Sequence, residues 1–294
     1  MSAYILQLTV NALQVSVFYA LVAVAYVLFH GVTNRFNLAF GAMVMLAGYS
    51  VIGLTAGLLV RGMDARLALA AACCWAAALS ALAGGWLTRT VYRPAMAGTP
   101  LAMMIATIGV AIVMEEIARL AADSREMWLE PLLTRRREIA AQVYLTDMQV
   151  ATIAAAGLGV ALLWYLIEKR PFGRLWRAVS QDAGMAALLG VDGTRVLYAT
   201  GILSAAAAGF AGALIGLAYG NASYHTGIFI GSKALLVAII GGMRSIPLVV
   251  AGAFALGLFE SFWTGFLPGT WRDVASFAVL AAFLVLLNPR ESRV

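Results

Sequence analysis

Residues 5–29, ILQLTVNALQVSVFYALVAVAYVLF, decide the fold because they run without a charged side chain over a length that can cross a membrane. A membrane-spanning helix needs about 20 predominantly apolar residues. No Lys or Arg precedes Arg35, so the stretch lacks the basic region of a cleavable signal peptide, and it is too long for the apolar part of one. We therefore expect residues 5–29 to form the first membrane-spanning helix.

The composition of the whole chain agrees with a membrane protein. Hydrophobic residues make up 63% of the sequence and charged residues 12%, at a mean hydropathy of +0.90. These values exclude an ordinary soluble domain. The net charge of +6 is dispersed between apolar runs and forms no basic face with interleaved aromatic residues. We therefore expect the lipid bilayer, and not nucleic acid, as a partner of the chain.

Seven further segments have the length and composition of spanning helices: 36–60, 66–88, 100–122, 150–168, 194–218, 246–266 and 271–288. A ninth apolar run, 228–242, is too short to span comfortably and is bracketed by Gly227 and the Gly241-Gly242 pair. We expect it to be a broken helix or a re-entrant segment, which is tolerated at membrane depth only beside protein or a water-filled path. The sequence predicts an all-α integral membrane protein, a polytopic helical bundle of about eight to nine membrane segments. Residues 1–294 are expected to form a single transmembrane domain.

The segment FGRLWRAVSQDAGMAALLG, residues 172–190, is polar enough to lie outside the membrane. Its apolar residues recur at spacings of three and four, which places them on one helical face: Phe172, Trp176, Val179, Ala183 and Ala186. Arg174, Arg177 and Gln181 fall on another face. A basic amphipathic helix of this kind either docks onto a soluble partner at the membrane surface or folds onto the lipid headgroups. The pattern alone leaves both alternatives open.

Positively charged connections predict the orientation, because loops rich in Lys and Arg stay in the cytoplasm. The connection at 169–195 is the most basic: Lys169, Arg170, Arg174, Arg177 and Arg195. Counting spans outward from it places further arginines on the same side: Arg35, Arg89, Arg93, Arg244, Arg290 and Arg293. Three arginines fall on the outer side and oppose this assignment: Arg135, Arg136 and Arg137. We expect the N-terminus outside and the C-terminus in the cytoplasm.

The residues of the chain do not predict an enzyme. His30 and His225 are the only histidines and lie far apart in the sequence, so no metal-ligand spacing is present. A Walker A motif requires Gly-Lys-Ser/Thr, and neither Lys169 nor Lys233 stands in that context. We expect no catalytic residue, no metal site and no cofactor on this chain, so any ATP that drives transport binds another subunit.

Few charges lie inside the apolar runs, and Glu260 is the one carboxylate expected well inside a span. A carboxylate there costs on the order of 2–3 kcal/mol or more unless it is paired, protonated or hydrated. Two interpretations stay open: a residue of a translocation pathway or gate, or a carboxylate hydrogen-bonded between helices. Glu115 and Glu116 lie within helical reach of Arg119 near the outer end of their span, which predicts an interfacial ion pair.

Two polar or glycine-containing openings point to a pathway through the membrane. Residues 37–41, Asn-Leu-Ala-Phe-Gly, open the second span, and residues 227–231 open the short apolar run. Such openings in each half of a transporter often mark discontinuous helices around a central site. The alternative is an ordinary helix that uses Asn37 as its cap.

Five motifs, in order along nearly the whole chain, resemble permease subunits of branched-chain amino acid ABC importers of the LivH type. They are Arg-Phe-Asn-Leu-Ala-Phe-Gly-Ala (35–42), Tyr92-Arg93-Pro94, Ala106-Thr107-Ile108-Gly109, the segment from Phe172-Gly173-Arg174 to Gly190-Val191-Asp192, and the 241–247 turn, Gly-Gly-Met-Arg-Ser-Ile-Pro. The resemblance implies that the 172–192 element is a cytoplasmic loop docked in a groove of the ATPase. Its coupling positions would be Gly173, Arg174, Arg177, Asp182, Ala186 and Gly190. The candidate residues of the translocation pathway are Asn37, Gly41, Thr107, Gly241, Gly242 and Glu260.

The resemblance also implies a location and a set of partners. The chain would be a multi-pass subunit of the bacterial inner membrane that moves a small polar solute inward, driven by two separate ATP-binding-cassette ATPase subunits. A second permease subunit, related or identical, and an extracytoplasmic solute-binding protein would complete the importer. The family commonly has a His and a Glu around positions 40 and 42, where this chain has Phe40 and Ala42. The solutes expected therefore extend from branched-chain amino acids to urea and short amides.

Two other classes of function remain as alternatives. A self-sufficient ion-coupled carrier would need several ionisable residues deep in its spans and no docked ATPase. An intramembrane enzyme would need a nucleophile with its base, or a set of metal ligands.

Overall fold

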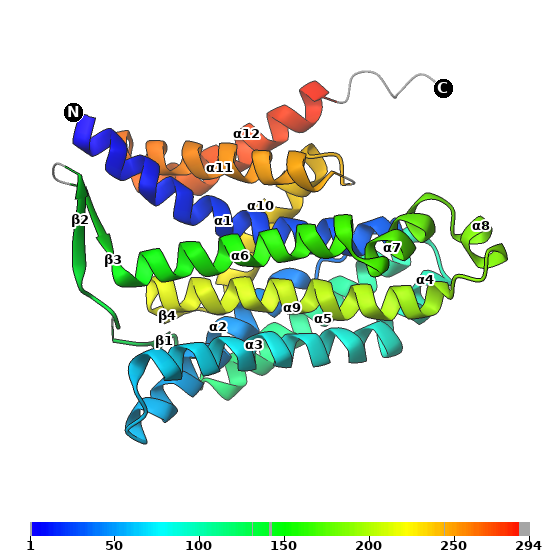
Figure 1. The fold of residues 1–294 in the computed structure, drawn as a ribbon, viewed down its shortest axis with the longest axis horizontal. Helices are drawn as coiled ribbons and strands as arrows, with labels where there is room; N and C mark the ends of the chain where they lie inside the picture. The colour runs from blue at the N-terminus through cyan, green and yellow to red at the C-terminus, as the bar shows by residue number, and fades with distance from the viewer. Residues whose placement is uncertain (1, 131, 141–142, 244, 288–294) are drawn as a thin grey trace.

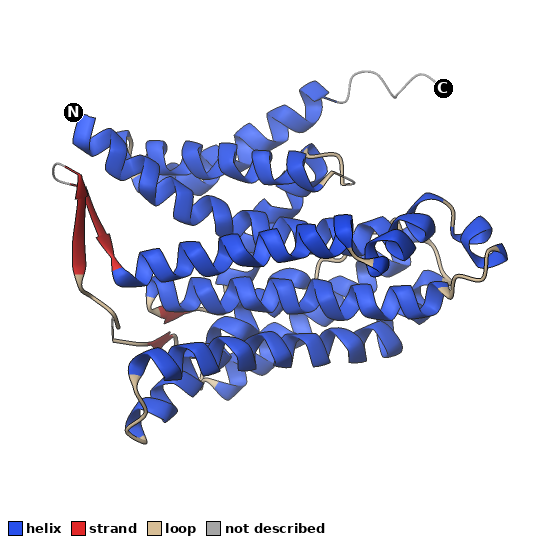
Figure 2. Ribbon diagram, in the orientation of Figure 1, coloured by secondary structure: helices blue, strands red, loops and turns tan. Residues whose placement is uncertain are grey.

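The computed structural model describes residues 2–130, 132–140, 143–243 and 245–287. Helices make up most of the described chain, and two small two-stranded sheets lie at one end of the bundle (Figures 1 and 2). Three arginines that we expected on the cytoplasmic side lie outside the described residues: Arg244, Arg290 and Arg293.

Eight helical segments are long and apolar enough to cross a membrane. They are α1 (Ser2–Thr33), α2 (Phe40–Val60), α3 (Ala65–Leu87), α5 (Pro100–Ala121), α6 (Asp147–Lys169), α9 (Gly193–Tyr219), α11 (Ile246–Phe266) and α12 (Arg272–Leu287). A π-helical turn, Thr88–Tyr92, and α4 (Arg93–Met96) continue α3, and a 3-10 turn, Gly269–Trp271, leads into α12, so that the last apolar segment runs from Gly269 to Leu286. Each long helix overlaps one of the eight predicted spans, so the expected polytopic helical bundle is confirmed.

The short apolar run forms α10 (Thr226–Ile240), one unbroken helix of 15 residues. Its length is about 22 Å at 1.5 Å per residue, which is less than the roughly 30 Å of a hydrocarbon core. The helix ends at Ile240 and is capped by Gly241, and Gly242 has a φ of +79° that favours glycine. The irregular backbone of this region therefore follows α10 and does not interrupt it.

α1 and α9 form the centre of the bundle. Every residue from Ser16 to Phe29 is buried, and α1 packs against α6, α9, α10 and α11. The absence of charged side chains from α1 lets it lie inside the bundle, where an unpaired charge would be costly. α9 approaches α2 closely, because a Cβ on Gly212 would overlap the carbonyl oxygen of Val44.

The helices run alternately between two ends of the bundle (Figure 1). At the end that holds the start of α1, the Tyr4 hydroxyl donates to the carbonyl oxygen of Gly265, and Gln7 exchanges hydrogen bonds with the backbone of Tyr144. Strands β2 (Arg136–Ala140) and β3 (Val143–Thr146) pair there, as do β1 (Met127–Trp128) and β4 (Asn221–Ala222). The opposite end holds α4, the short helices α7 (Pro171–Gln181) and α8 (Ala183–Leu188), and the end of α12.

Candidate functional site

The segment at 172–190 folds as two short helices, α7 and α8, that meet at Asp182. Asp182 has extended backbone, with φ −154° and ψ 103°, and its Oδ1 accepts a hydrogen bond from the backbone N–H of Met185 at 2.9 Å. An Asp that caps a new helix in this way competes with continuation of the previous one. The prediction of one helix with a continuous apolar face is therefore wrong beyond Gln181, and Ala183, expected on that face, is exposed.

α7 is held against the bundle by two close contacts. The indole Nε1 of Trp176 donates to the carbonyl oxygen of Leu28 in α1 at 2.9 Å, and the ring lies over Gly31. Gly173 faces the end of α6 so closely that a Cβ at this position would overlap the carbonyl oxygen of Ile167. Both contacts seat α7 on the ends of two spanning helices.

The predicted coupling residues divide into exposed and buried groups. Three are exposed: Arg174, Asp182 and Gly190. Two are buried and position the segment: Gly173 and Ala186. The sixth, Arg177, is half-buried, donates to the carbonyl oxygen of Ile167 and lies 3.5 Å from the Glu168 carboxylate. The exposed side of α7 and α8 is therefore basic at Arg174 and acidic at Asp182.

Three of the predicted pathway residues meet where α2 begins. The backbone N–H of Leu38 donates to Thr107 Oγ1 at 3.2 Å, which joins the extended start of the second span to α5. Asn37 Oδ1 accepts from the N–H of Ala39 at 3.0 Å, but α2 starts at Phe40 and its N-cap is Ala39. Asn37 therefore shapes a turn before the helix and is not its N-cap.

Glycines bring α2 and α10 into contact at this point. A Cβ on Gly227 would lie 2.5 Å from the carbonyl oxygen of Gly41, and one on Gly231 would lie 2.6 Å from the Cα of Gly41. The two openings singled out in the sequence, 37–41 and 227–231, are thus neighbours in the fold. We call this contact the glycine crossing.

A cavity of about 220 Å³ adjoins the glycine crossing. Its lining is mainly apolar and comes from α1, α2, α5, α10 and the connections that precede α2 and α10: Tyr26, Leu38, Gly41, Ala42, Met45, Ile108, Ala111, Ile112, Glu115, Tyr224, Gly227, Ile228, Gly231 and Ser232. Ala42 lines this cavity, whereas Phe40 is buried in edge-to-face contact with Tyr26 and Phe29. Of the two positions singled out by the resemblance, only Ala42 therefore lines the cavity.

The remaining glycine candidates lie elsewhere. Gly241 and Gly242 form the turn after α10, and a Cβ on Gly241 would overlap the side chain of Val249 in α11. Neither glycine lines the cavity at the glycine crossing. Their observed role is a tight connection between α10 and α11.

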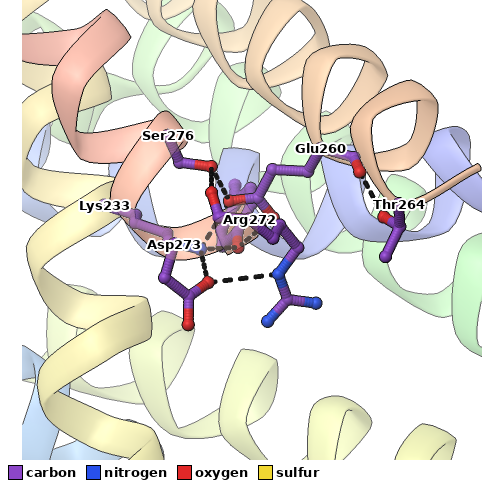
Figure 3. A network of polar contacts seen from close by, with 7 residues as sticks. Lys233, Glu260, Thr264, Arg272, Asp273 and Ser276 are labelled. Atoms are coloured by element: carbon purple, nitrogen blue, oxygen red, sulfur yellow. Dashed lines mark hydrogen bonds and ion pairs between the residues drawn. The ribbon is translucent and has the colours of Figure 1, made fainter. Parts of the chain in front are cut away.

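Glu260 belongs to a buried network of charges between α1, α10, α11 and α12 (Figure 3). Its Oε1 lies 2.5 Å from Lys233 Nζ and accepts from the Ser276 hydroxyl at 2.8 Å, while its Oε2 accepts from the Tyr19 hydroxyl at 2.8 Å. Lys233 Nζ also lies 2.8 Å from Asp273 Oδ1. The Lys233 and Glu260 side chains are only 2% and 4% exposed. Glu260 is thus hydrogen-bonded between helices, as one of the two interpretations expected.

The sequence prediction did not include the partners of Glu260. Lys233 stands in the 228–242 run, and Asp273 in the first turn of α12, yet only Glu260 was expected deep in a span. The available signal was charge balance, because an ionised group at membrane depth requires a partner. The ion pair predicted for Glu116 and Arg119 is confirmed at 2.7 Å.

A second cavity, of about 380 Å³, is lined in part by the charged side chains of this network. Its lining reaches the connection before α10 and combines polar with apolar side chains: Val15, Tyr19, Ile215, Tyr219, Asn221, Ser223, His225, Thr226, Phe229, Ile230, Lys233, Glu260, Arg272 and Asp273. The size falls within the range of small-molecule sites.

Comparison with known proteins gives matches along almost the whole chain. A family model described as "Branched-chain amino acid transport system / permease component" matches residues 8–284. The high-affinity branched-chain amino acid transport system permease protein LivH of Salmonella typhimurium is 32% identical over 289 residues, which cover 97% of this chain and 94% of that protein. The corresponding permease protein BraD of Pseudomonas aeruginosa is 30% identical over 287 residues, or 96% and 93% of the two chains. The permease protein LivM of Salmonella typhimurium matches 38% of this chain, at 32% identity over 115 residues.

Proposed function

Because this chain belongs to the family of branched-chain amino acid transport permeases, we propose that it forms a membrane pathway through which an ATP-driven importer moves an aliphatic amino acid into the cell. It is the permease component of such a system, and ATP hydrolysis takes place on separate subunits. The partners proposed are two ATPase subunits, an extracytoplasmic solute-binding protein and a second permease. A match to both LivH and LivM of one organism supports a related second permease.

The cavity at the glycine crossing supports an aliphatic solute. Ala42, Met45, Ile108 and Ile112 give it an apolar wall beside the start of α2. An apolar pocket favours a branched aliphatic side chain and offers few hydrogen-bonding groups to urea or an amide. The pathway proposed runs along α2, α5 and α10, and passes Asn37, Gly41 and Thr107 at the start of α2.

The exposed side of α7 and α8 is the proposed docking surface for the ATPase. Arg174 and Asp182 offer one positive and one negative group, and Trp176 and Gly173 fix α7 to α1 and α6. A rigidly seated surface passes a displacement of the ATPase on to the bundle, whereas a loosely tethered loop absorbs it. The two close contacts that hold α7 against the bundle therefore favour docking over the alternative of a segment that rests on lipid headgroups.

We expect the double variant Arg174→Ala/Asp182→Asn to insert and assemble normally but to lose most of its ATP-driven uptake. Substitutions on an exposed surface usually cost little stability, and Asn retains the oxygen that caps α8. Measured in proteoliposomes that contain the complete importer and its binding protein, leucine uptake and leucine-stimulated ATP turnover should fall about fivefold or more, the lower end of energetic coupling between sites. Wild-type leucine uptake that proceeds without ATP would instead show an ion-coupled carrier, and preferred uptake of urea would reject the aliphatic substrate. Full stimulation in the double variant would reject the docking surface.

The orientation is proposed with the N-terminus outside and α7 and α8 in the cytoplasm of a bacterial inner membrane. α7 and the connection from α5 to β1 lie at opposite ends of the bundle (Figure 1). Arg174 in α7 and Ser124 in that connection are both exposed, so cysteines at these positions report on the two sides. In intact cells, and in a background without Cys73 and Cys74, a membrane-impermeant thiol reagent should label the cysteine at position 124 and not the one at 174. After the cells are permeabilised, both should react. The reverse pattern in intact cells would invert the topology.

A further inference from the structure

All four charged side chains of the network line the 380 Å³ cavity. Two of them, Arg272 and Asp273, still have hydrogen-bonding atoms without a partner among the described residues. Asp273 Oδ1 accepts from both Lys233 Nζ, at 2.8 Å, and Arg272 Nε, at 3.1 Å. Within the described part of the chain, Asp273 Oδ2 and the two terminal nitrogens of Arg272 make no hydrogen bond. The side chains of Arg272 and Asp273 are 43% and 38% exposed, in contrast to the enclosed Lys233 and Glu260.

The unused atoms of these two side chains point the same way. Figure 3 shows the guanidinium of Arg272 and the outer carboxylate oxygen of Asp273 directed to one side, away from Glu260. The contact between Arg272 Nε and Asp273 Oδ1 holds the two groups side by side. The two terminal nitrogens of Arg272 and the Oδ2 of Asp273 therefore offer paired donors and one acceptor side by side. Arg272 is held by Asp273, which is held by Lys233, and Lys233 is paired with the buried carboxylate of Glu260.

The charges of the network balance. Lys233 and Arg272 are positive, whereas Glu260 and Asp273 are negative, so the four groups together are neutral. A ligand with a net charge would leave one charge without compensation in a partly desolvated site. A ligand that carries one carboxylate and one ammonium group adds no net charge and matches both free ends.

We propose that this cavity binds the zwitterionic head of an α-amino acid, with the carboxylate on Arg272 and the ammonium group on Asp273 Oδ2. Arg presents paired donors that suit a carboxylate, and a carboxylate oxygen accepts from an ammonium group. The apolar part of the lining, Val15, Ile215, Phe229 and Ile230, lies available for an aliphatic side chain. This proposal rests on the proposed function, since it assigns a first binding site to the amino acid that the importer is proposed to move.

α10 separates this site from the glycine crossing. Thr226, Phe229, Ile230 and Lys233 face the charged cavity. The other side of the same helix, at Gly227, Ile228, Gly231 and Ser232, lines the apolar cavity. The head-group site is therefore distinct from the aliphatic cavity, and one short helix forms the wall between them.

The test is substrate protection of a cysteine in the charged cavity, measured on the complete importer without its binding protein. Thr226→Cys, in a background without Cys73 and Cys74, places a thiol among the lining residues. Leucine should slow its alkylation, whereas leucinamide, which lacks the carboxylate, and isocaproate, which lacks the ammonium group, should not. A cysteine at Ser124, outside the cavity, should react at the same rate with and without leucine.

Variants of the two proposed contacts complete the test. In the Thr226→Cys background, Arg272→Gln or Asp273→Asn should raise the leucine concentration for half-protection about tenfold, as expected for loss of one charge-assisted contact. Arg119→Gln, which breaks the exposed ion pair with Glu116, should not change it. Equal protection by leucine and both analogues, or no protection by leucine, would overturn the proposal. Because protection requires neither ATP nor transport, its failure is distinguishable from failure of leucine uptake by the wild-type importer.

Discussion

Replacing Lys233 with Met is expected to destabilise the permease by about 3–5 kcal/mol, the usual cost of breaking a buried ion pair by removal of one partner. Met fills a similar volume but leaves the buried carboxylate of Glu260 without its cation, and Asp273 keeps only Arg272. Thermal unfolding of the purified chain in detergent, followed together with the yield of inserted protein, measures the effect. We expect an early transition and a low yield.

Two controls separate the charge from the packing. Lys233→Met/Glu260→Leu removes both buried charges, so it should recover much of the lost stability. Glu116→Gln removes one partner of the exposed pair with Arg119 and should leave the transition almost unchanged. If Lys233→Met unfolds at the wild-type temperature, or if the double variant is no better than the single one, the network does not stabilise the fold.

Gly173→Val is expected to abolish coupled transport while the eight long helices stay inserted. The added side chain would overlap the carbonyl oxygen of Ile167, so α7 must move off the end of α6. The hydrogen bond from Trp176 to Leu28 is then lost as well. In the complete importer, leucine uptake should fall to background, with leucine-stimulated ATP turnover falling in parallel.

Gly193→Val is the matched control for this loss. Gly193 stands in the same connection, at the start of α9, and nothing lies within 4 Å of a Cβ built on it. This variant should transport leucine at close to the wild-type rate. Near-normal uptake in Gly173→Val, or an equal loss in Gly193→Val, would show that the seat of α7 has no part in coupling.

The spans were predictable because their signal is local. Length and apolar composition alone placed α11 at 246–266, where the structure has Ile246–Phe266. The interruption at Asp182 was not predictable from the spacing of apolar residues, because it depends on a side-chain hydrogen bond to Met185 that stops one helix and starts another.

The candidate site was predictable only in its separate parts. Glu260 was singled out, but its partner Lys233 lies 27 residues away on another helix. No rule of helical spacing joins two such residues. In the same way, Leu38 and Thr107 are 69 residues apart, and only the packing of α2, α5 and α10 brings the two predicted openings together.

The hydrogen bond from Trp176 to Leu28 gives α1 a second structural role besides its place in the core. α1 is one uninterrupted helix that carries Leu28, at the attachment of α7, and Tyr19, which bonds Glu260. These two positions are about 14 Å apart along the helix axis at 1.5 Å per residue. One continuous helix therefore connects the proposed docking surface for the ATPase with the buried charges of the proposed head-group site. In the proposed orientation, α1 would therefore transmit a movement of α7 at the cytoplasmic face to the charged groups proposed to hold the solute.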